Sequence, residues 1–183
     1  MTVLGIDPGT AACGYGIVHE RGNRLRAVDF GWWQTPAGRR PELRLKTIFD
    51  GVTELIEQFD PVAVVLEESF VGVDARTALS VGQARGAVLV AAALQGVECT
   101  EYAPARVKQA VCGYGRAEKA QVQRMVKAIL SLQALPTPNH ASDALAVAIC
   151  HALAPPLLRI ASEPAAPGRQ RVLRPAGNVR GRA

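Results

Sequence analysis

The chain has 183 residues, of which 49% are hydrophobic and 20% charged, and it carries a formal net charge of +5. This length and composition predict a single globular domain that is large enough to bury a proper core. The N-terminus reaches Asp7 without a basic segment, and the longest apolar run, residues 86–94, is short for a membrane span. We therefore expect a cytoplasmic protein with no membrane partner.

The positive charge is concentrated at the C-terminal end. Residues 159–183 hold six arginines and one glutamate, together with several prolines and glycines, and show no helical or strand periodicity. We predict a folded domain over residues 1–155 and a basic, mobile extension over residues 156–183. Such an extension can bind nucleic-acid phosphates or can serve only to keep the protein soluble.

The apolar periodicity predicts an α/β protein. The expected strands are 2–7, 12–20, 24–34, 61–67 and 97–102. The expected helices are 41–59, about 75–95, 104–112, 118–132 and 138–153. Three consecutive strands, followed by strands that alternate with helices, indicate a mixed five-stranded sheet flanked by helices on both faces.

Two glycines and two tryptophans in the second and third predicted strands indicate how these strands pack. Gly14 and Gly16 predict a strand to which another backbone or a ligand comes close. Trp32 and Trp33 occupy successive faces of the third strand, so we expect at least one of them in the core. Neither tryptophan is assigned to DNA from the sequence.

Acidic residues follow two of the apolar strands. Asp7 ends the first strand, and either Glu67 or Glu68 ends the fourth, since these two point to opposite faces and spacing alone does not choose between them. Asp143 follows His140 by three residues, so the two share one face of a helix. A carboxylate at the end of a buried strand is costly unless it is paired or binds a cation. Together these residues predict a divalent-metal site.

Five motifs occur in an order that resembles one protein family. They are Gly5-Ile6-Asp7-Pro8-Gly9-Thr10, Leu66-Glu67-Glu68-Ser69-Phe70, Val81-Gly82-Gln83-Ala84-Arg85-Gly86, Arg106-Val107-Lys108-Gln109 through Ala117-Glu118-Lys119, and His140-Ala141-Ser142-Asp143-Ala144-Leu145. Over roughly residues 1–155 they resemble the RuvC family, the bacterial Holliday-junction resolvases. The resemblance implies a ribonuclease-H-like fold and a homodimer that nicks two opposed strands of a four-way DNA junction. It further implies 5′-phosphate and 3′-hydroxyl products, a role in recombination and repair, and a branch-migration motor as a further partner.

The resemblance also implies the site residues. The family's catalytic, metal-binding acids carry over onto Asp7, Glu67 and Asp143, which favours Glu67 over Glu68. The fourth family position falls on His140, where many relatives have an aspartate. Carboxylates suit Mg²⁺, and two such ions can activate water and stabilise the leaving 3′ oxygen. An imidazole in place of a carboxylate shifts the preference toward Mn²⁺.

The residues expected to bind DNA surround this site. The resemblance places Lys108 and Lys119 beside DNA phosphates and Phe70 against a base near the crossover. Arg116 flanks the same loop as the two lysines, and ordinary solvated charges are the alternative for Arg76 and Arg85. The candidates are Phe70, Arg76, Arg85, Lys108, Arg116 and Lys119. In the helix 75–95, Gly82 and Gly86 suit close packing against a second copy, although a helix buried within one chain would look similar.

Two other functional classes remain open. An actin-like phosphotransferase uses a similar Asp-Gly-Thr turn as a phosphate loop, but it needs a duplicated domain that 183 residues cannot hold. A non-catalytic junction-binding module needs only a dimer and a basic tail. It gains nothing, however, from carboxylates held near phosphates.

Overall fold

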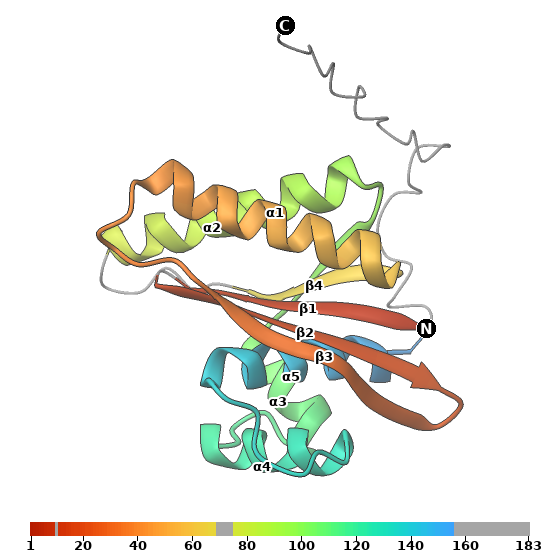
Figure 1. The fold of residues 1–183 in the computed structure, drawn as a ribbon. Helices are drawn as coiled ribbons and strands as arrows, with labels where there is room; N and C mark the ends of the chain where they lie inside the picture. Colours follow the sequence, from red (N-terminus) through yellow and green to blue (C-terminus); the bar gives the residue numbers. More distant parts are fainter. Residues whose placement is uncertain (10, 69–74, 156–183) are drawn as a thin grey trace, which may run out of the picture.

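A central sheet with helices on both faces makes up the part of the chain that this computed structural model describes, residues 1–9, 11–68 and 75–155 (Figure 1). The strands are β1 (Thr2–Pro8), β2 (Ala12–Arg21), β3 (Arg24–Gln34), β4 (Ala63–Glu67) and β5 (Glu98–Tyr102). The helices are α1 (Pro41–Phe59), α2 (Ala75–Leu94), α3 (Pro104–Cys112), α4 (Lys119–Ile129) and α5 (Asn139–Leu153). These elements confirm the predicted α/β class and element order.

The five strands lie in the order β3-β2-β1-β4-β5. β2 runs antiparallel to β1 and β3, whereas β4 is parallel to both β1 and β5. The sheet is therefore mixed, as predicted, and β1 and β4 are covered on both faces. Because parallel strands end at the same edge of a sheet, the carboxyl ends of β1, β4 and β5 lie together.

Side chains that alternate along the strands build one core on each face of the sheet. Leu4 and Ile6 of β1 pack with α1 and α2, while Val3 packs with α3, α4 and α5. Figure 1 shows these two helical layers on opposite sides of the sheet. Residues of β1 with odd numbers, Asp7 included, therefore face the α5 layer.

Two glycines let α5 lie directly on the sheet. A Cβ atom at Gly5 would stand 2.0 Å from the carbonyl oxygen of Ala144, and one at Gly14 would stand 2.1 Å from that of His140. No side chain fits at either distance. The close approach predicted at Gly14 is thus made by the backbone of the first turn of α5.

The outer face of α2 is open to solvent. Ala84 and Val88 are buried, but Leu79 is 66% and Leu94 61% exposed. By length and composition alone α2 could cross a membrane, with 22% of its most apolar window buried. The apolar run 86–94 is shorter than this helix, so the run alone did not indicate a helix long enough to span a membrane. The predicted basic extension, residues 156–183, lies outside the described residues.

Candidate active site

Asp7, Glu67, His140 and Asp143 gather at one edge of the sheet, on the α5 face, and are termed here the four-residue cluster. β1 pairs in parallel with β4, and the last pair, Ile6 with Leu66, brings Asp7 and Glu67 side by side at the ends of their strands. The N-terminal part of α5 crosses this edge and carries His140 in its first turn and Asp143 at the start of the second. The fold thus brings together the four residues implied by the resemblance.

The packing of β4 decides which of the adjacent glutamates, Glu67 or Glu68, faces the cluster. Ala63 and Val65 belong to the core on the α5 face, so Glu67 continues that face. Glu68 is exposed, and its backbone N–H donates to the carbonyl oxygen of Tyr102 at 2.9 Å. Only Glu67 of the two therefore faces the cluster.

His140 is held against Asp7. The His140 Nδ1 atom lies 2.6 Å from Asp7 Oδ2, across 133 residues of sequence. Because an ionised carboxylate can only accept, Nδ1 is the donor, and in the neutral form of the ring Nε2 then keeps its lone pair. Gly9 leaves room for the ring, since a Cβ atom there would stand 3.2 Å from His140 Cε1. The imidazole thus has one nitrogen committed to Asp7 and one free for a metal or a water molecule.

The carboxylates carry more negative charge than their surroundings compensate. Burial raises the pKa of Asp7, and the nearby charge of Asp143 raises it too, against the opposing effect of the His140 hydrogen bond. Burial likewise raises the pKa of Glu67, as do the charges of Asp7 and Asp143. Both shifts mean that the ionised forms are costly here, and a bound cation would relieve that cost.

Two of the expected basic residues lie at the cluster. Lys119 Nζ donates to Asp143 Oδ2 at 2.6 Å, and this hydrogen bond raises the pKa of Lys119. The charge of Lys108 is close enough to act on Glu67, whose pKa it lowers against the larger effect of burial. Both lysines thus place positive charge beside the four-residue cluster.

The types of donor atom in the four-residue cluster fit a divalent cation. Carboxylate oxygens are the ligands that Mg²⁺ and Mn²⁺ prefer, and burial, together with the charges of neighbouring carboxylates, raises the pKa values of Asp7 and Glu67. Among the described residues, however, no three acidic, histidine or cysteine side chains stand as a ready ligand shell. In this structure one oxygen of Asp7 is engaged by His140 and one oxygen of Asp143 by Lys119.

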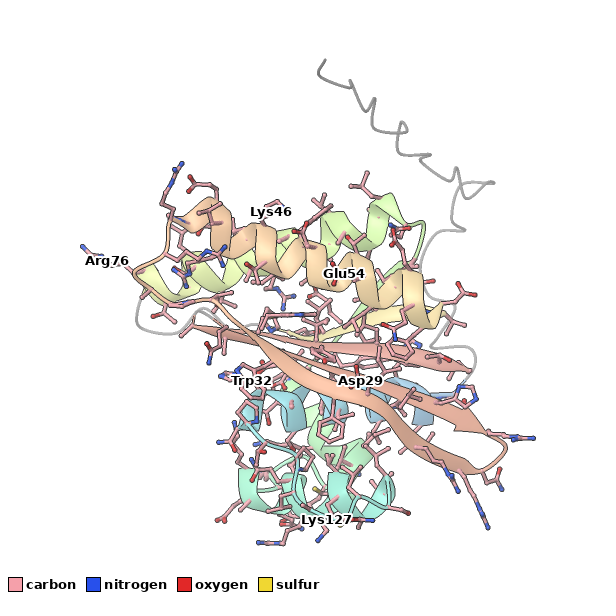
Figure 2. All side chains as sticks on the ribbon, in the orientation of Figure 1. Asp29, Trp32, Lys46, Glu54, Arg76 and Lys127 are labelled. Carbon is pink, nitrogen blue, oxygen red and sulfur yellow. The ribbon has the colours of Figure 1, made fainter. Side chains whose placement is uncertain are left out.

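The remaining DNA-binding candidates are more dispersed. Arg116 is exposed in the segment that joins α3 to α4, shortly before Lys119. Arg76 is exposed at the start of α2, in the opposite helical layer (Figure 2). Phe70 lies outside the described residues.

Arg85, a candidate DNA-binding residue in the sequence, is mostly buried and paired within the protein. Its side chain is 13% exposed, and Nη2 pairs with Glu101 Oε1 at 2.5 Å. Nη1 donates to the main-chain carbonyl oxygen of Glu67 at 2.7 Å. The sequence did not reveal these two contacts of Arg85. The one indication was that Arg85 lies near Ala84 and Val88 on the same helix, and both of these residues are apolar.

Comparisons with known proteins agree with this geometry. The family described as "Crossover junction endodeoxyribonuclease RuvC" matches residues 3–151. A protein of that name from Moorella thermoacetica is 53% identical over 152 residues, which are 83% of this chain and 91% of the relative. The solved structure of Thermus thermophilus RuvC superposes with a TM-score of 0.79 at 40% identity, over 84% of this chain and 94% of that one. The same T. thermophilus protein in complex with Holliday junction substrate gives a TM-score of 0.77 at 38% identity, with the same coverage.

Proposed function

This chain belongs to the RuvC family of crossover junction endodeoxyribonucleases, and on that premise we propose that the four-residue cluster is its catalytic centre. The protein is a metal-dependent endonuclease of the ribonuclease-H-like fold that resolves four-way DNA junctions in recombination and repair. One observation carries the assignment of the centre: three carboxylates and an imidazole from β1, β4 and α5 converge on one edge of the sheet. We also propose that the protein acts in the cytoplasm.

The two other functional classes lose their support. A non-catalytic junction binder does not account for carboxylates whose ionised forms are costly where they stand. An actin-like phosphotransferase needs a second, duplicated domain, whereas the described residues form one five-stranded sheet. Membership in an endonuclease family is the simpler account of both features.

The chemistry assigns a task to each residue of the cluster. Bound divalent cations, two Mg²⁺ ions in our proposal, supply an activated water and stabilise the charge that develops on the leaving 3′ oxygen. Asp7 sits between Glu67 and the first turn of α5, so it would be the central ligand of the bound cations. Glu67 and Asp143 complete the ligands on either side. His140 offers Nε2 to a metal or to the attacking water, which favours activity with Mn²⁺ as well as Mg²⁺.

Basic side chains neutralise the phosphates that approach this acidic centre. Lys108 and Lys119 lie at the cluster, where either can pair with a phosphate oxygen once DNA is present. Arg116 and Arg76 extend the basic surface at greater distance. Phe70, which directly follows the strand that carries Glu67, is proposed to contact a base near the crossover.

A second copy of the chain is the proposed partner of the open face of α2. Gly82 and Gly86 have open space where a Cβ atom would stand, so they serve no close packing against the part of the chain that the structure describes. A shallow groove between α1 and α2, lined by Phe49, Gly86 and Val90 among others, adjoins them. A two-fold dimer presents two equivalent sites, as two opposed nicks require. A branch-migration motor is a further proposed partner on the family resemblance alone.

A synthetic four-way junction tests the proposed function directly. Each of its four strands is labelled in turn and incubated with the protein and either Mg²⁺ or Mn²⁺. We expect nicks at symmetric positions in two opposed strands and no cutting of a linear duplex of the same sequence. Cutting of the duplex at an equal rate, or nicks in one strand only, would contradict paired resolution.

The dimer has its own test. Val90→Glu places a charge on the open face of α2 and should convert a dimer to a monomer in size-exclusion chromatography with light scattering. Val62→Glu is the matched control, because Val62 is similarly exposed but lies just before β4. A monomeric wild-type protein at micromolar concentration, or a dimer that Val90→Glu leaves intact, would contradict the α2 interface.

A further inference from the structure

We propose that the exposed indole of Trp32 is a DNA-binding element of the site, which stacks on a nucleoside of the cut strand close to the scissile phosphate. The inference rests on the proposed function and adds a DNA-binding residue that the sequence reasoning did not assign. It starts from the different fates of two adjacent tryptophans on β3.

Trp33 is part of the core, and Trp32 is not. The Trp33 ring stacks on Tyr15 with 4.9 Å between centroids and lies over Gly51 of α1, where a Cβ atom would stand 2.3 Å from the ring. Trp32 is 43% exposed and, among the described residues, belongs to neither apolar core and stacks on no other ring. The fold therefore uses one indole for packing and leaves the other available.

The register of the sheet places Trp32 at the rim of the site. Trp32 pairs with Gly14 on β2, and Gly14 pairs with Asp7 on β1. Directly paired residues share a face of the sheet, so Trp32 lies in the same row and on the same face as Asp7. With strands spaced by about 4.8 Å, the two Cα atoms are roughly 10 Å apart. That distance spans about three base-pair steps of B-form DNA.

The first turn of α5 stands between Asp7 and Trp32. It lies so close over Gly14 that a Cβ atom there would stand 2.1 Å from the His140 carbonyl oxygen. His140 reaches from this turn toward Asp7, and Trp32 flanks the turn on its other side, at the edge strand β3 (Figure 2). The indole thus forms the β3 side of the site, opposite the side that Lys108 approaches near Glu67.

A nucleoside is the occupant that matches this position. DNA cut at the cluster must pass within a few nucleotides of Asp7, and an aromatic ring that protrudes there can stack on a base whatever its identity. Stacking of this kind adds affinity without an ion pair. Loss of Trp32 should therefore weaken DNA binding without changing its salt dependence, which distinguishes Trp32 from the basic residues around the site.

Fluorescence gives a direct readout because the chain has only two tryptophans. In the Trp33→Phe variant the emission comes from Trp32 alone, and in Trp32→Phe it comes from Trp33 alone. In metal-free buffer, where no cutting occurs, we expect junction DNA to quench Trp32 and to shield it from acrylamide, while Trp33 is unaffected. Trp32 emission that acrylamide cannot reach in the free protein, or that DNA leaves unchanged, would overturn the proposal.

Affinity provides the second arm, which does not depend on how Trp33→Phe folds. Trp32→Ala should weaken junction binding roughly 5- to 100-fold, as expected when one stacked base is released, whereas Trp32→Phe should retain most of the affinity. The slope of log affinity against log salt should stay that of the wild type, because the basic residues still bind the same phosphates. Val28→Ala, an exposed apolar residue of the same strand, is the matched control and should bind like the wild type.

The outcomes separate this inference from the proposed function. If the wild-type protein neither binds nor cuts the junction, the function itself is wrong. If it does both while Trp32→Ala binds with unchanged affinity, only the role of Trp32 is wrong. A reduced salt slope in Trp32→Ala would also contradict stacking, since it would show that fewer phosphates are neutralised in the complex.

Discussion

Arg85 on α2 donates a hydrogen bond of 2.7 Å to the main-chain carbonyl oxygen of Glu67, so a helix on one face of the sheet anchors an acid that points to the other. Glu101 of β5 holds the same guanidinium in place at 2.5 Å. The end of β4 is thereby tied both to the next strand and to the helix proposed to form the dimer. We therefore predict that Arg85 acts on the site through Glu67, as a positioning residue.

The first prediction concerns this anchor. Arg85→Gln should lower junction cutting about 10- to 100-fold, the usual effect of removing a group that orients a metal ligand. The loss should appear as a higher Mg²⁺ concentration for half-maximal activity, with Arg85→Lys restoring part of it. Arg24→Gln, at an exposed position that begins β3, is the matched control for the removal of a surface charge. An unchanged Mg²⁺ requirement combined with a lower melting temperature would assign Arg85 to stability alone.

The second prediction concerns Asp7. Asp7→Asn should reduce cutting on the order of 1,000-fold or more, because it removes a charge worth several kcal/mol in holding the catalytic ions. Junction binding should persist or tighten, since a carboxylate beside the phosphates repels them. Gel-shift titrations of both proteins in the same buffer measure the two effects separately. Loss of binding in parallel with loss of cutting would argue that Asp7 supports the fold and not the chemistry.

The third prediction follows from the raised pKa values of Asp7 and Glu67. A carboxyl group with a raised folded-state pKa stabilises the fold below its unfolded pKa, and this contribution is lost as the pH rises through the folded pKa. In EDTA at pH 7, Asp7→Asn should therefore melt at a higher temperature than the wild type. The difference should shrink as the pH falls toward the ordinary Asp value of 3.8. Glu67→Gln should behave in the same way.

Divalent metal supplies the control for this prediction. Added Mg²⁺ or Mn²⁺ should raise the melting temperature of the wild type and remove the advantage of Asp7→Asn, because the ion binds only the folded site. Equal melting temperatures at every pH in EDTA would show that the two carboxylates are already compensated.

Some parts of this fold could be predicted from the sequence because they depend on local patterns. The continuous apolar run of β4 indicated a strand covered on both faces, and Gly14 indicated a close approach. The choice between Glu67 and Glu68 could not be made from spacing, since alternation gives two faces without saying which one meets Asp7. It depends on which helices cover each face, and that is a property of the tertiary fold.

The same limit explains the residues that the sequence left unassigned. Trp32 and Trp33 were expected on opposite faces, but only the packing of α1 over Trp33 shows which ring is used in the core. Arg85 looks like a solvated helical charge until β4 and β5 supply its partners. The pairing of Lys119 with Asp143 likewise joins residues 24 positions apart that no local pattern connects.

The fourth prediction tests the histidine of the cluster. His140→Asp replaces an imidazole by a carboxylate, so activity in Mg²⁺ should rise relative to activity in Mn²⁺ because a hard oxygen replaces a softer nitrogen. His140→Ala should lose activity with both ions. The measurement is the ratio of initial cutting rates in the two metals for the three proteins. Identical ratios and rates in all three would reduce the site to Asp7, Glu67 and Asp143.

The last prediction concerns the basic C-terminal residues. Truncation after Pro156 removes all six arginines of residues 159–183, and it should weaken junction binding and flatten its salt dependence. Each phosphate that the shortened protein no longer neutralises should reduce the steepness of log affinity against log salt by about 0.9 for duplex DNA, so a difference of two phosphates is measurable. Structure-selective nicking should survive at low salt, because the four-residue cluster lies within residues 1–155. A full-length variant with glutamine in place of the six arginines separates charge from length, and it should match the truncated protein. A slope equal to that of the wild type in both variants would show that the arginines do not bind DNA.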